Sequence, residues 1–146
     1  MEHSPRRYFE DVELGDELGP MSLNVSQEQV VAYCRVWGRP IPNRFTDSEM
    51  AQREGMRGTM VPGPLSMAYM AHLVSEWSAD AQVRRLESVF RRPISLGQQV
   101  ELSGVVVDKE IVDGEKQIQC DLYIKSLEGD RLIGGKAVIS LASRPV

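Results

Sequence analysis

The sequence lacks the features that mark several classes of protein. No apolar run approaches the roughly 20 residues that a helix needs to cross a bilayer. The polar segment at residues 1–7 contains no apolar signal core. The net charge is only −4, so the charge gives no reason to expect nucleic acid or an anionic membrane as a partner. We therefore expect a cytoplasmic protein that binds neither.

Cysteine and histidine are also scarce, with two of each in the chain. Cys34 and Cys120 lie in segments of apolar periodicity and have no metal-ligand spacing. Free cysteine usually packs as a small apolar side chain, so we expect both to be buried. The sequence predicts no metal site.

Length and composition favour one folded domain. A chain of 146 residues with 42% hydrophobic residues can bury a substantial core. It contains no internal repeat, low-complexity tract or linker. We expect a single domain over residues 1–146, in which residues 1–7 form a frayed tail.

Two helices are predicted in the first half of the chain. Ser26 and Gln29 have the spacing of a capping box, apolar residues follow at helical spacing, and Gly38 ends the run. Asp47 can cap a second, short helix that continues to Arg53. Two prolines rule out regular structure between these helices.

The segment at residues 64–77 predicts a buried helix. Pro64 suits a first helical turn. The residues after it are apolar on nearly every face, interrupted mainly by Ser66 and His72. A helix that is apolar all round is surrounded by protein or by lipid, and this one is too short to span a bilayer. We expect almost all of it to be inaccessible to water.

Period-two patterns predict strands in the second half of the chain, after a short strand at residues 22–25. Turn residues at 113–114 and 128–130 separate the later strands. Such a sheet has one apolar face, and the helix at 64–77 is the available cover. The expected class is α+β, with a curved antiparallel sheet around one central helix, the hot-dog arrangement. The predicted strands cover residues 83–92, 100–106, 118–124 and 133–141.

Three segments resemble the MaoC-like hot-dog hydratases and dehydratases, and they keep that family's order along the chain. Phe-Glu-Asp-Val-Glu-Leu-Gly-Asp at 9–16 is similar to the family's first segment. Val-Pro-Gly at 61–63 is similar to the family's Val-His-Gly before the central helix. Phe-Arg-Arg-Pro-Ile-Ser-Leu-Gly at 90–97 is similar to its Phe-Arg-x-Pro-Val-x-x-Gly-Asp strand, with Gln98 in place of the acid.

The resemblance implies a dimer that binds acyl thioesters in tunnels between its subunits. In active family members, an Asp and a His in the loop after the first helix activate a water molecule that adds to a conjugated double bond. The backbone N–H at the position of Gly63 polarises the thioester carbonyl. Val61, Gly63, Asn43, Arg91 and Arg92 are therefore the candidate substrate-binding residues.

The loop at residues 38–45 departs from the family pattern. Arg39 or Pro40 occupies the position of the catalytic Asp, and Arg44 or Phe45 occupies the position of the His. An arginine stays protonated and cannot act as a base, and phenylalanine carries no proton. The sequence thus predicts that the acid–base pair is absent.

Other residues offer weaker substitutes for that pair. His72 lies four residues before Glu76, and its structural alternative is a helix histidine beside a carboxylate. Asp47 and Glu49 are explained more simply as residues of a helix start. Asn43 could orient water, or it could be a turn residue.

Arginines and methionines are the remaining candidates for ligand binding. Guanidinium groups suit the phosphates of CoA, and the alternative is a solvated basic surface. Methionines could line an acyl tunnel or simply fill the core. The arginines are Arg39, Arg44, Arg57, Arg91 and Arg92, and the methionines are Met56, Met60, Met67 and Met70.

The sequence leaves open whether the chain is an enzyme. The favoured hypothesis is an acyl-CoA- or acyl-ACP-binding subunit or paralogue of an enoyl-CoA hydratase or 3-hydroxyacyl dehydratase, without the Asp/His pair. Alternatives are an active (R)-specific hydratase that uses other residues, a hot-dog thioesterase, and an interaction protein without a ligand. No cofactor is expected beyond the CoA or phosphopantetheine of the substrate. The expected partner is a second copy or a catalytic hot-dog subunit.

Overall fold

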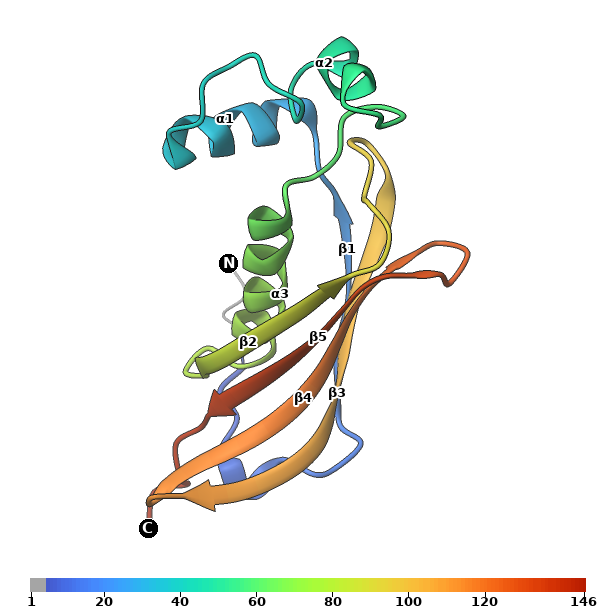
Figure 1. Ribbon diagram of the computed structural model, residues 1–146. Helices are drawn as coiled ribbons and strands as arrows, with labels where there is room; N and C mark the ends of the chain where they lie inside the picture. Colours follow the sequence, from blue (N-terminus) through green and yellow to red (C-terminus); the bar gives the residue numbers. More distant parts are fainter. Residues whose placement is uncertain (1–4) are drawn as a thin grey trace.

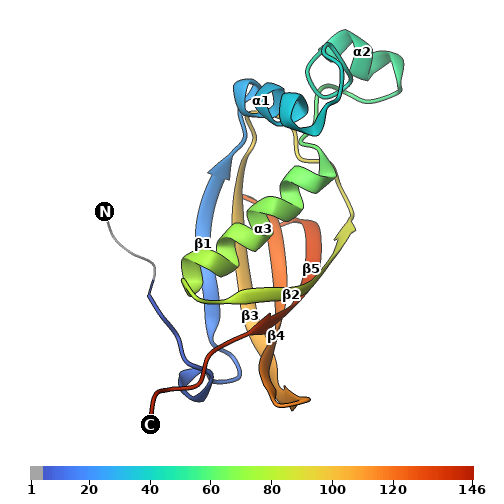
Figure 2. The ribbon, with the colours of Figure 1, turned by 90° about the vertical axis from the view of Figure 1, so that its left-hand side faces the viewer.

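A five-stranded antiparallel sheet curves around helix α3 (Figures 1 and 2). The computed structural model describes residues 5–146. The strands lie in the order β1-β3-β4-β5-β2, so β1 and β2 form the two edges of the sheet. Along the chain, the elements are a 3₁₀ turn (Phe9–Asp11), β1 (Glu17–Asn24), α1 (Gln27–Trp37), α2 (Ser48–Arg53), α3 (Gly63–Trp77), β2 (Gln82–Phe90), β3 (Gln99–Val112), β4 (Glu115–Ser126) and β5 (Arg131–Ser140).

The period-two pattern of the sequence produces the apolar face of the sheet. On β4, every second side chain from Ile118 to Ile124 faces the core and is at most 1% exposed. The neighbouring strand supplies Val100, Leu102 and Val106, of which Leu102 lies opposite Ile124. The predicted α+β class and the sheet around a central helix are confirmed.

Helix α3 packs one side against this face. Met70, Leu73 and Val74 are at most 2% exposed and belong to the core. The expectation of an almost wholly inaccessible helix is wrong on the opposite side, because the sheet covers only one side and no other part of residues 5–146 covers the rest. The exposed strip consists of Pro64, Ala68, His72, Ser75 and Glu76, and Met67 is half-buried.

The predicted helix boundaries at α1 and α2 are confirmed. Ser26 accepts a hydrogen bond from the Gln29 N–H while the Gln29 side chain accepts one from the Ser26 N–H, which completes the capping box. Gly38 ends α1 in the left-handed conformation, with φ of 77°. Asp47 Oδ1 accepts a hydrogen bond from the Met50 N–H at 3.0 Å. Figure 1 shows α1 and α2 beyond the N-terminal end of α3.

Strand β1 begins earlier than the predicted strand at 22–25. It starts at Glu17 and continues past Gly19 and Pro20, with an irregular register between Leu18 and Met21. An edge strand can hold a proline because one of its sides needs no backbone donor. Gly19 and Pro20 interrupt the pairing with β3, and the strand continues on both sides of them.

Residues 5–7, expected to fray, are hydrogen-bonded to the C-terminal end of α3. The Ala79 N–H donates to the Pro5 carbonyl at 3.0 Å. Arg7 donates from its backbone N–H to Ser78 Oγ at 3.1 Å and from Nε to the Trp77 carbonyl at 2.7 Å. The rest of the predicted tail, with His3, lies outside the described residues. No helix in the described part of the chain is long and apolar enough to cross a membrane.

Candidate functional site

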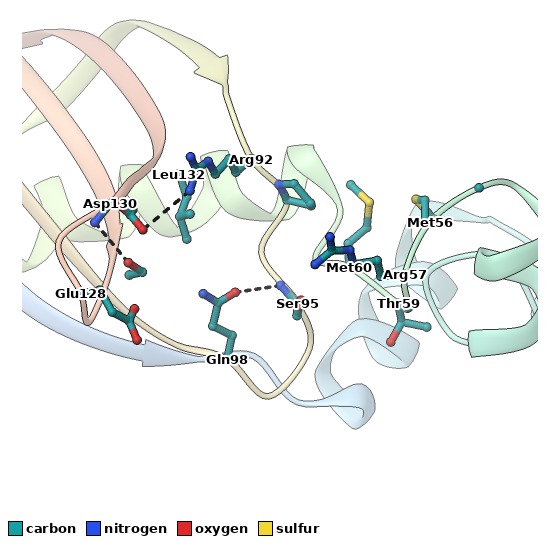
Figure 3. A pocket seen from close by; sticks show the side chains of 14 residues that line it. Met56, Arg57, Thr59, Met60, Arg92, Ser95, Gln98, Glu128, Asp130 and Leu132 are labelled. Carbon is teal, nitrogen blue, oxygen red and sulfur yellow. Dashed lines mark hydrogen bonds and ion pairs between the residues drawn. The ribbon is translucent and has the colours of Figure 1, made fainter.

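Two adjoining cavities lie at the N-terminal end of α3. The inner cavity, of about 410 Å³, is lined mainly by apolar residues that include Val61, Gly63 and Phe90. The outer cavity, of about 560 Å³, is lined by polar residues that include Arg57, Gln98 and Asp130 (Figure 3). Met56, Met60, Arg92 and Pro93 line both cavities, so the two form one groove.

Backbone hydrogen bonds join two of the segments that line this groove. The Val61 N–H donates to the Ile94 carbonyl at 2.8 Å, and Met60 pairs with Ser95 in an antiparallel bridge. The chain that leads into α3 is thereby joined to the chain that follows β2. This pairing brings two sequence segments, about residues 60 and 94, to the same side of the groove.

Gly63 is the first residue of α3 and lines the inner cavity. The first N–H groups of a helix have no acceptor within the helix, and they form its positive end. No residue between 5 and 146 accepts a hydrogen bond from the Gly63 N–H. The Phe90 ring lies so close that a Cβ atom at Gly63 would be 3.2 Å from Phe90 Cζ. The glycine therefore allows the Phe90 ring to approach the start of α3 closely, and the Gly63 N–H beside the inner cavity stays without an acceptor from the described residues.

Ser66 supplies a hydroxyl group to the otherwise mainly apolar inner cavity. It is 2% exposed, and its Oγ lies 3.5 Å from the Pro62 carbonyl, at the limit of a hydrogen bond. In the sequence, this residue stood out only as an interruption of an apolar helix. Its place on the cavity wall was not predicted.

The five candidate arginines separate into two groups. Arg57 and Arg92 line the outer cavity, and Arg91 and Arg92 line the inner one. Arg92 Nη1 lies 3.6 Å from Asp130 Oδ2, whereas Arg57 has no ion-pair partner among residues 5–146. Arg39 and Arg44 line neither cavity. Three of the five candidate arginines thus line the groove, and at its outer end Glu128 and Asp130 lie beside Arg57 and Arg92.

The other two arginines pack on Phe45 in the loop after α1. The guanidinium carbons of Arg39 and Arg44 lie 4.9 and 5.0 Å from the centre of the Phe45 ring. The Trp37 ring lies 6.1 Å from the same ring, and Phe45 is only 5% exposed. Phe45, at one of the two positions aligned with the catalytic histidine, is therefore the packed centre of a loop.

The Asn43 side chain also forms hydrogen bonds within this loop. Its Oδ1 accepts a hydrogen bond from the Phe45 N–H at 2.8 Å, and its Nδ2 donates to the Pro40 carbonyl at 3.0 Å. Asn43 is 6% exposed and lines neither cavity. These hydrogen bonds are those of a turn residue, which was one of the two roles considered for Asn43. They give no support to the predicted contact between Asn43 and the substrate.

The weak substitutes for the acid–base pair do not reach the inner cavity. His72 Nε2 lies 3.5 Å from Glu76 Oε1, and both side chains are about half exposed on the far part of α3. Asp47 caps α2. No Asp, Glu or His lines the inner cavity. The carboxylates of the groove, Glu128 and Asp130, belong to its outer end.

The structure therefore brings together four of the five predicted substrate-binding residues: Val61, Gly63, Arg91 and Arg92. The segment Phe90–Arg92 could be assigned to the site from the sequence, because it resembles a motif of the MaoC-like family. The polar residues of the outer cavity could not be assigned in this way, because they come from separate loops. Among residues 5–146, no group of three or more His, Cys, Asp or Glu side chains is arranged to hold a metal ion.

Solved structures show which fold this is. A monoamine oxidase regulatory protein from Archaeoglobus has a TM-score of 0.83 and 18% identity, over 99% of this chain and 100% of that one. A MaoC-like dehydratase from Rhodospirillum rubrum has a TM-score of 0.80 and 17% identity, over 96% and 99%. An (R)-hydratase from A. caviae involved in PHA biosynthesis has a TM-score of 0.78 and 17% identity, over 89% and 97%.

Another similar structure is a complex, the (3R)-hydroxyacyl-ACP dehydratase HadBC from Mycobacterium tuberculosis, with a TM-score of 0.74 and 14% identity, over 87% of this chain and 96% of that one. No protein-family model matches the chain, and no curated protein sequence matches it. At these identities, the likeness concerns the fold. The chain has the hot-dog fold of the MaoC-like dehydratases and (R)-hydratases.

Proposed function

We propose that this chain binds an acyl thioester and does not hydrate it. In this proposal, it is a MaoC-like subunit or paralogue of an enoyl-CoA hydratase or 3-hydroxyacyl dehydratase that lacks the acid–base pair. The observation that carries the proposal is the inner cavity. Its wall contains a helix N-terminus at Gly63 but no carboxylate and no imidazole.

The groove matches the parts of an acyl thioester in order. The Gly63 N–H can donate a hydrogen bond to the thioester carbonyl, and the helix dipole strengthens that bond. Val61, Met60 and Phe90 offer apolar contacts to the acyl group. Arg57 and Arg92 at the outer end suit the phosphates of CoA or phosphopantetheine, because guanidinium groups bind phosphate oxygens in pairs.

Hydration of a conjugated double bond needs a group that takes a proton from water and a group that returns one to carbon. A serine hydroxyl and an arginine guanidinium cannot take a proton from water at neutral pH. The hydroxyl is too weak a base, and the guanidinium already carries its proton. Asp130 lies in the outer cavity beside Arg92. We therefore expect the isolated chain to hydrate crotonyl-CoA no faster than the uncatalysed background.

The proposed partner is a second copy of the chain or a catalytic hot-dog subunit that supplies the missing pair. The HadBC complex is one similar structure built from more than one hot-dog chain. In either assembly, a chain of this kind would hold the thioester or complete a shared tunnel. The acid–base chemistry would belong to the other subunit.

Isothermal titration with butyryl-CoA, a saturated thioester that cannot be hydrated, tests the binding proposal. We expect saturable binding that weakens about tenfold or more when Arg57 and Arg92 are both replaced by alanine, since each charged hydrogen bond contributes about 1.5–3 kcal/mol. Butyryl-pantetheine, which has no phosphates, should bind equally to both proteins. Arg53→Ala, on exposed α2, is the matched control.

The same protein separates the alternatives. Release of free CoA from butyryl-CoA would indicate a thioesterase, and consumption of crotonyl-CoA well above background would indicate a hydratase with other catalytic residues. Absence of any binding at millimolar butyryl-CoA would contradict the proposed function. In that case, the interaction protein without a ligand would be the better hypothesis.

A further inference from the structure

The wall of the inner cavity contains a hydroxyl group, that of Ser66, which the proposed function does not use. The residue is 2% exposed. Apart from Arg91 and Arg92, the other residues that line this cavity are apolar or glycine. A polar group that is buried among such residues is unfavourable unless it finds a hydrogen-bond partner.

The Ser66 hydroxyl has no well-placed acceptor in the described part of the chain. Its Oγ lies 3.5 Å from the Pro62 carbonyl oxygen, whereas O–H···O hydrogen bonds are usually about 2.7–2.8 Å long. The same carbonyl already accepts a hydrogen bond from the Ser66 N–H at 3.1 Å. The hydroxyl proton is therefore available to a ligand in the cavity.

Ser66 lies one turn after Gly63 on α3. Positions three residues apart on a helix are neighbours, with about 5–6 Å between their Cβ positions. Helical side chains lean toward the N-terminal end, so the Ser66 hydroxyl lies on the side of Gly63. Both residues line the inner cavity, and the Gly63 N–H also lacks an acceptor among residues 5–146. Two unused donors thus adjoin the same apolar cavity.

We infer that the inner cavity prefers a 3-oxoacyl thioester, and that Ser66 donates a hydrogen bond to the oxygen on the third carbon. In such a thioester, a single carbon separates the two carbonyl groups, which suits two donors one helical turn apart. The Gly63 N–H binds the thioester oxygen, and Ser66 binds the second oxygen. The inference rests on the proposed function and names the acyl group that the site selects.

A 3-hydroxyacyl thioester fits this cavity less well. Its hydroxyl group carries a proton that needs an acceptor when it is buried. No carboxylate or imidazole among residues 5–146 lines the inner cavity. Ser66 can accept that proton only if it gives its own to the Pro62 carbonyl, across 3.5 Å. A 3-oxo group only accepts, so it leaves no donor unpaired. A saturated acyl group leaves the Ser66 hydroxyl without a partner.

Titration calorimetry with CoA thioesters of equal chain length tests this preference. At pH 7, we expect acetoacetyl-CoA to bind roughly 3- to 10-fold more tightly than butyryl-CoA, which is the effect of one added hydrogen bond. The two enantiomers of 3-hydroxybutyryl-CoA should bind within about twofold of butyryl-CoA, because their hydroxyl proton finds no good acceptor.

Variants of Ser66 test its role in the preference. In Ser66→Ala, acetoacetyl-CoA should bind no more tightly than butyryl-CoA, whose own affinity should change by less than about twofold. Ser66→Cys keeps a side chain of similar size with only a weak donor, so it should also lose most of the preference. Ser75→Ala is the matched control, since Ser75 Oγ lies 3.3 Å from the Ala71 carbonyl on the exposed side of α3. Circular dichroism checks that each variant is folded.

Equal binding of acetoacetyl-CoA and butyryl-CoA by the unmodified chain would overturn the inference and leave the proposed function standing. A preference that Ser66→Ala retains would also overturn it, as would 3-hydroxybutyryl-CoA that binds at least as tightly as acetoacetyl-CoA. Absence of binding by all four thioesters would contradict both the inference and the proposed function. If Ser66→Ala does not fold, Ser66→Cys and the comparison of ligands on the unmodified chain decide.

Discussion

Replacing Gly63 with alanine should weaken acyl-thioester binding while leaving the fold intact. The added Cβ would lie 3.2 Å from Phe90 Cζ and 3.4 Å from its Cε1, so the ring has to move by a few tenths of an ångström. Phe90 is 51% exposed and can move. Alanine also reduces the freedom of the unfolded chain, which stabilises by about 0.4–1 kcal/mol. We expect the free energy of unfolding to change by less than about 1 kcal/mol.

Binding should respond more strongly than stability. The methyl group would displace the Phe90 ring, which lines the inner cavity together with Gly63, whose N–H the thioester carbonyl would reach. Loss of one such hydrogen bond costs about 0.5–1.5 kcal/mol. Together with the lost space, we expect butyryl-CoA to bind about tenfold more weakly, which corresponds to about 1.4 kcal/mol.

Titration calorimetry and urea unfolding measure the two effects separately. Gly134→Ala is the matched control, because no atom lies within 4 Å of a Cβ placed there. Gly134 is also absent from both cavities. The control should bind butyryl-CoA like the unmodified chain. Unchanged binding by Gly63→Ala would refute the role of the Gly63 N–H, and global unfolding by that variant would refute the argument from Phe90 mobility.

Three further predictions follow from packing and ionisation. Gly135→Ala should lower the free energy of unfolding by about 1–3 kcal/mol, measured in urea, since its Cβ would lie 2.9 Å from the Glu87 carbonyl oxygen and 2.5 Å from Met70 Cε. The hydrogen bond from Lys116 lowers the pKa of Glu10 to about 2. A carboxyl group with a lower pKa in the folded state stabilises above its unfolded pKa of about 4.3, and this stability is lost as the pH falls toward 2. Unfolding of Glu10→Gln should therefore depend less on pH in this window. Burial raises the pKa of Cys120 to about 12, so iodoacetamide at pH 8 should label this thiol only after unfolding.

The parts of the fold that were predictable depend on residues close together in the sequence. The capping box of Ser26 and Gln29, the left-handed Gly38 and the alternation along β4 each need only a few adjacent positions. Their side chains and backbone groups meet within one turn or one strand. Such features can be recognised from the local sequence alone, without knowing which distant parts of the chain come together.

The exposed strip of α3 could not be predicted in the same way. Apolar residues on every face show that a helix needs cover, but they do not show where the cover comes from. The described part of the chain covers Met70 and Val74 and leaves Pro64 and Ala68 exposed. A helix that packs within one chain and a helix that also meets a second copy have the same apolar composition.

Only part of the candidate site followed from the sequence, for a related reason. Val61 and Gly63 lie at the start of α3, whereas Arg91 and Arg92 follow β2. The sequence connected these two segments only because each resembles a motif of the same family. Asn43 has a side chain that suits either a ligand or a turn. Its hydrogen bonds to Pro40 and Phe45 decide between these roles, and no spacing in the sequence reveals them.

The loop after α1 is consistent with a chain that does not carry out hydration itself. An imidazole at position 45 would lie beside the guanidinium groups of Arg39 and Arg44, whose central carbons now lie 4.9 and 5.0 Å from the centre of the Phe45 ring. Two nearby cations disfavour the protonated imidazole that a water-transfer cycle must form. The electron-rich face of a phenyl ring instead attracts neighbouring cations. If Phe45 is the position that matches the histidine, we expect that restoring the imidazole alone gives no activity, because Arg39 and Arg44 would remain beside it.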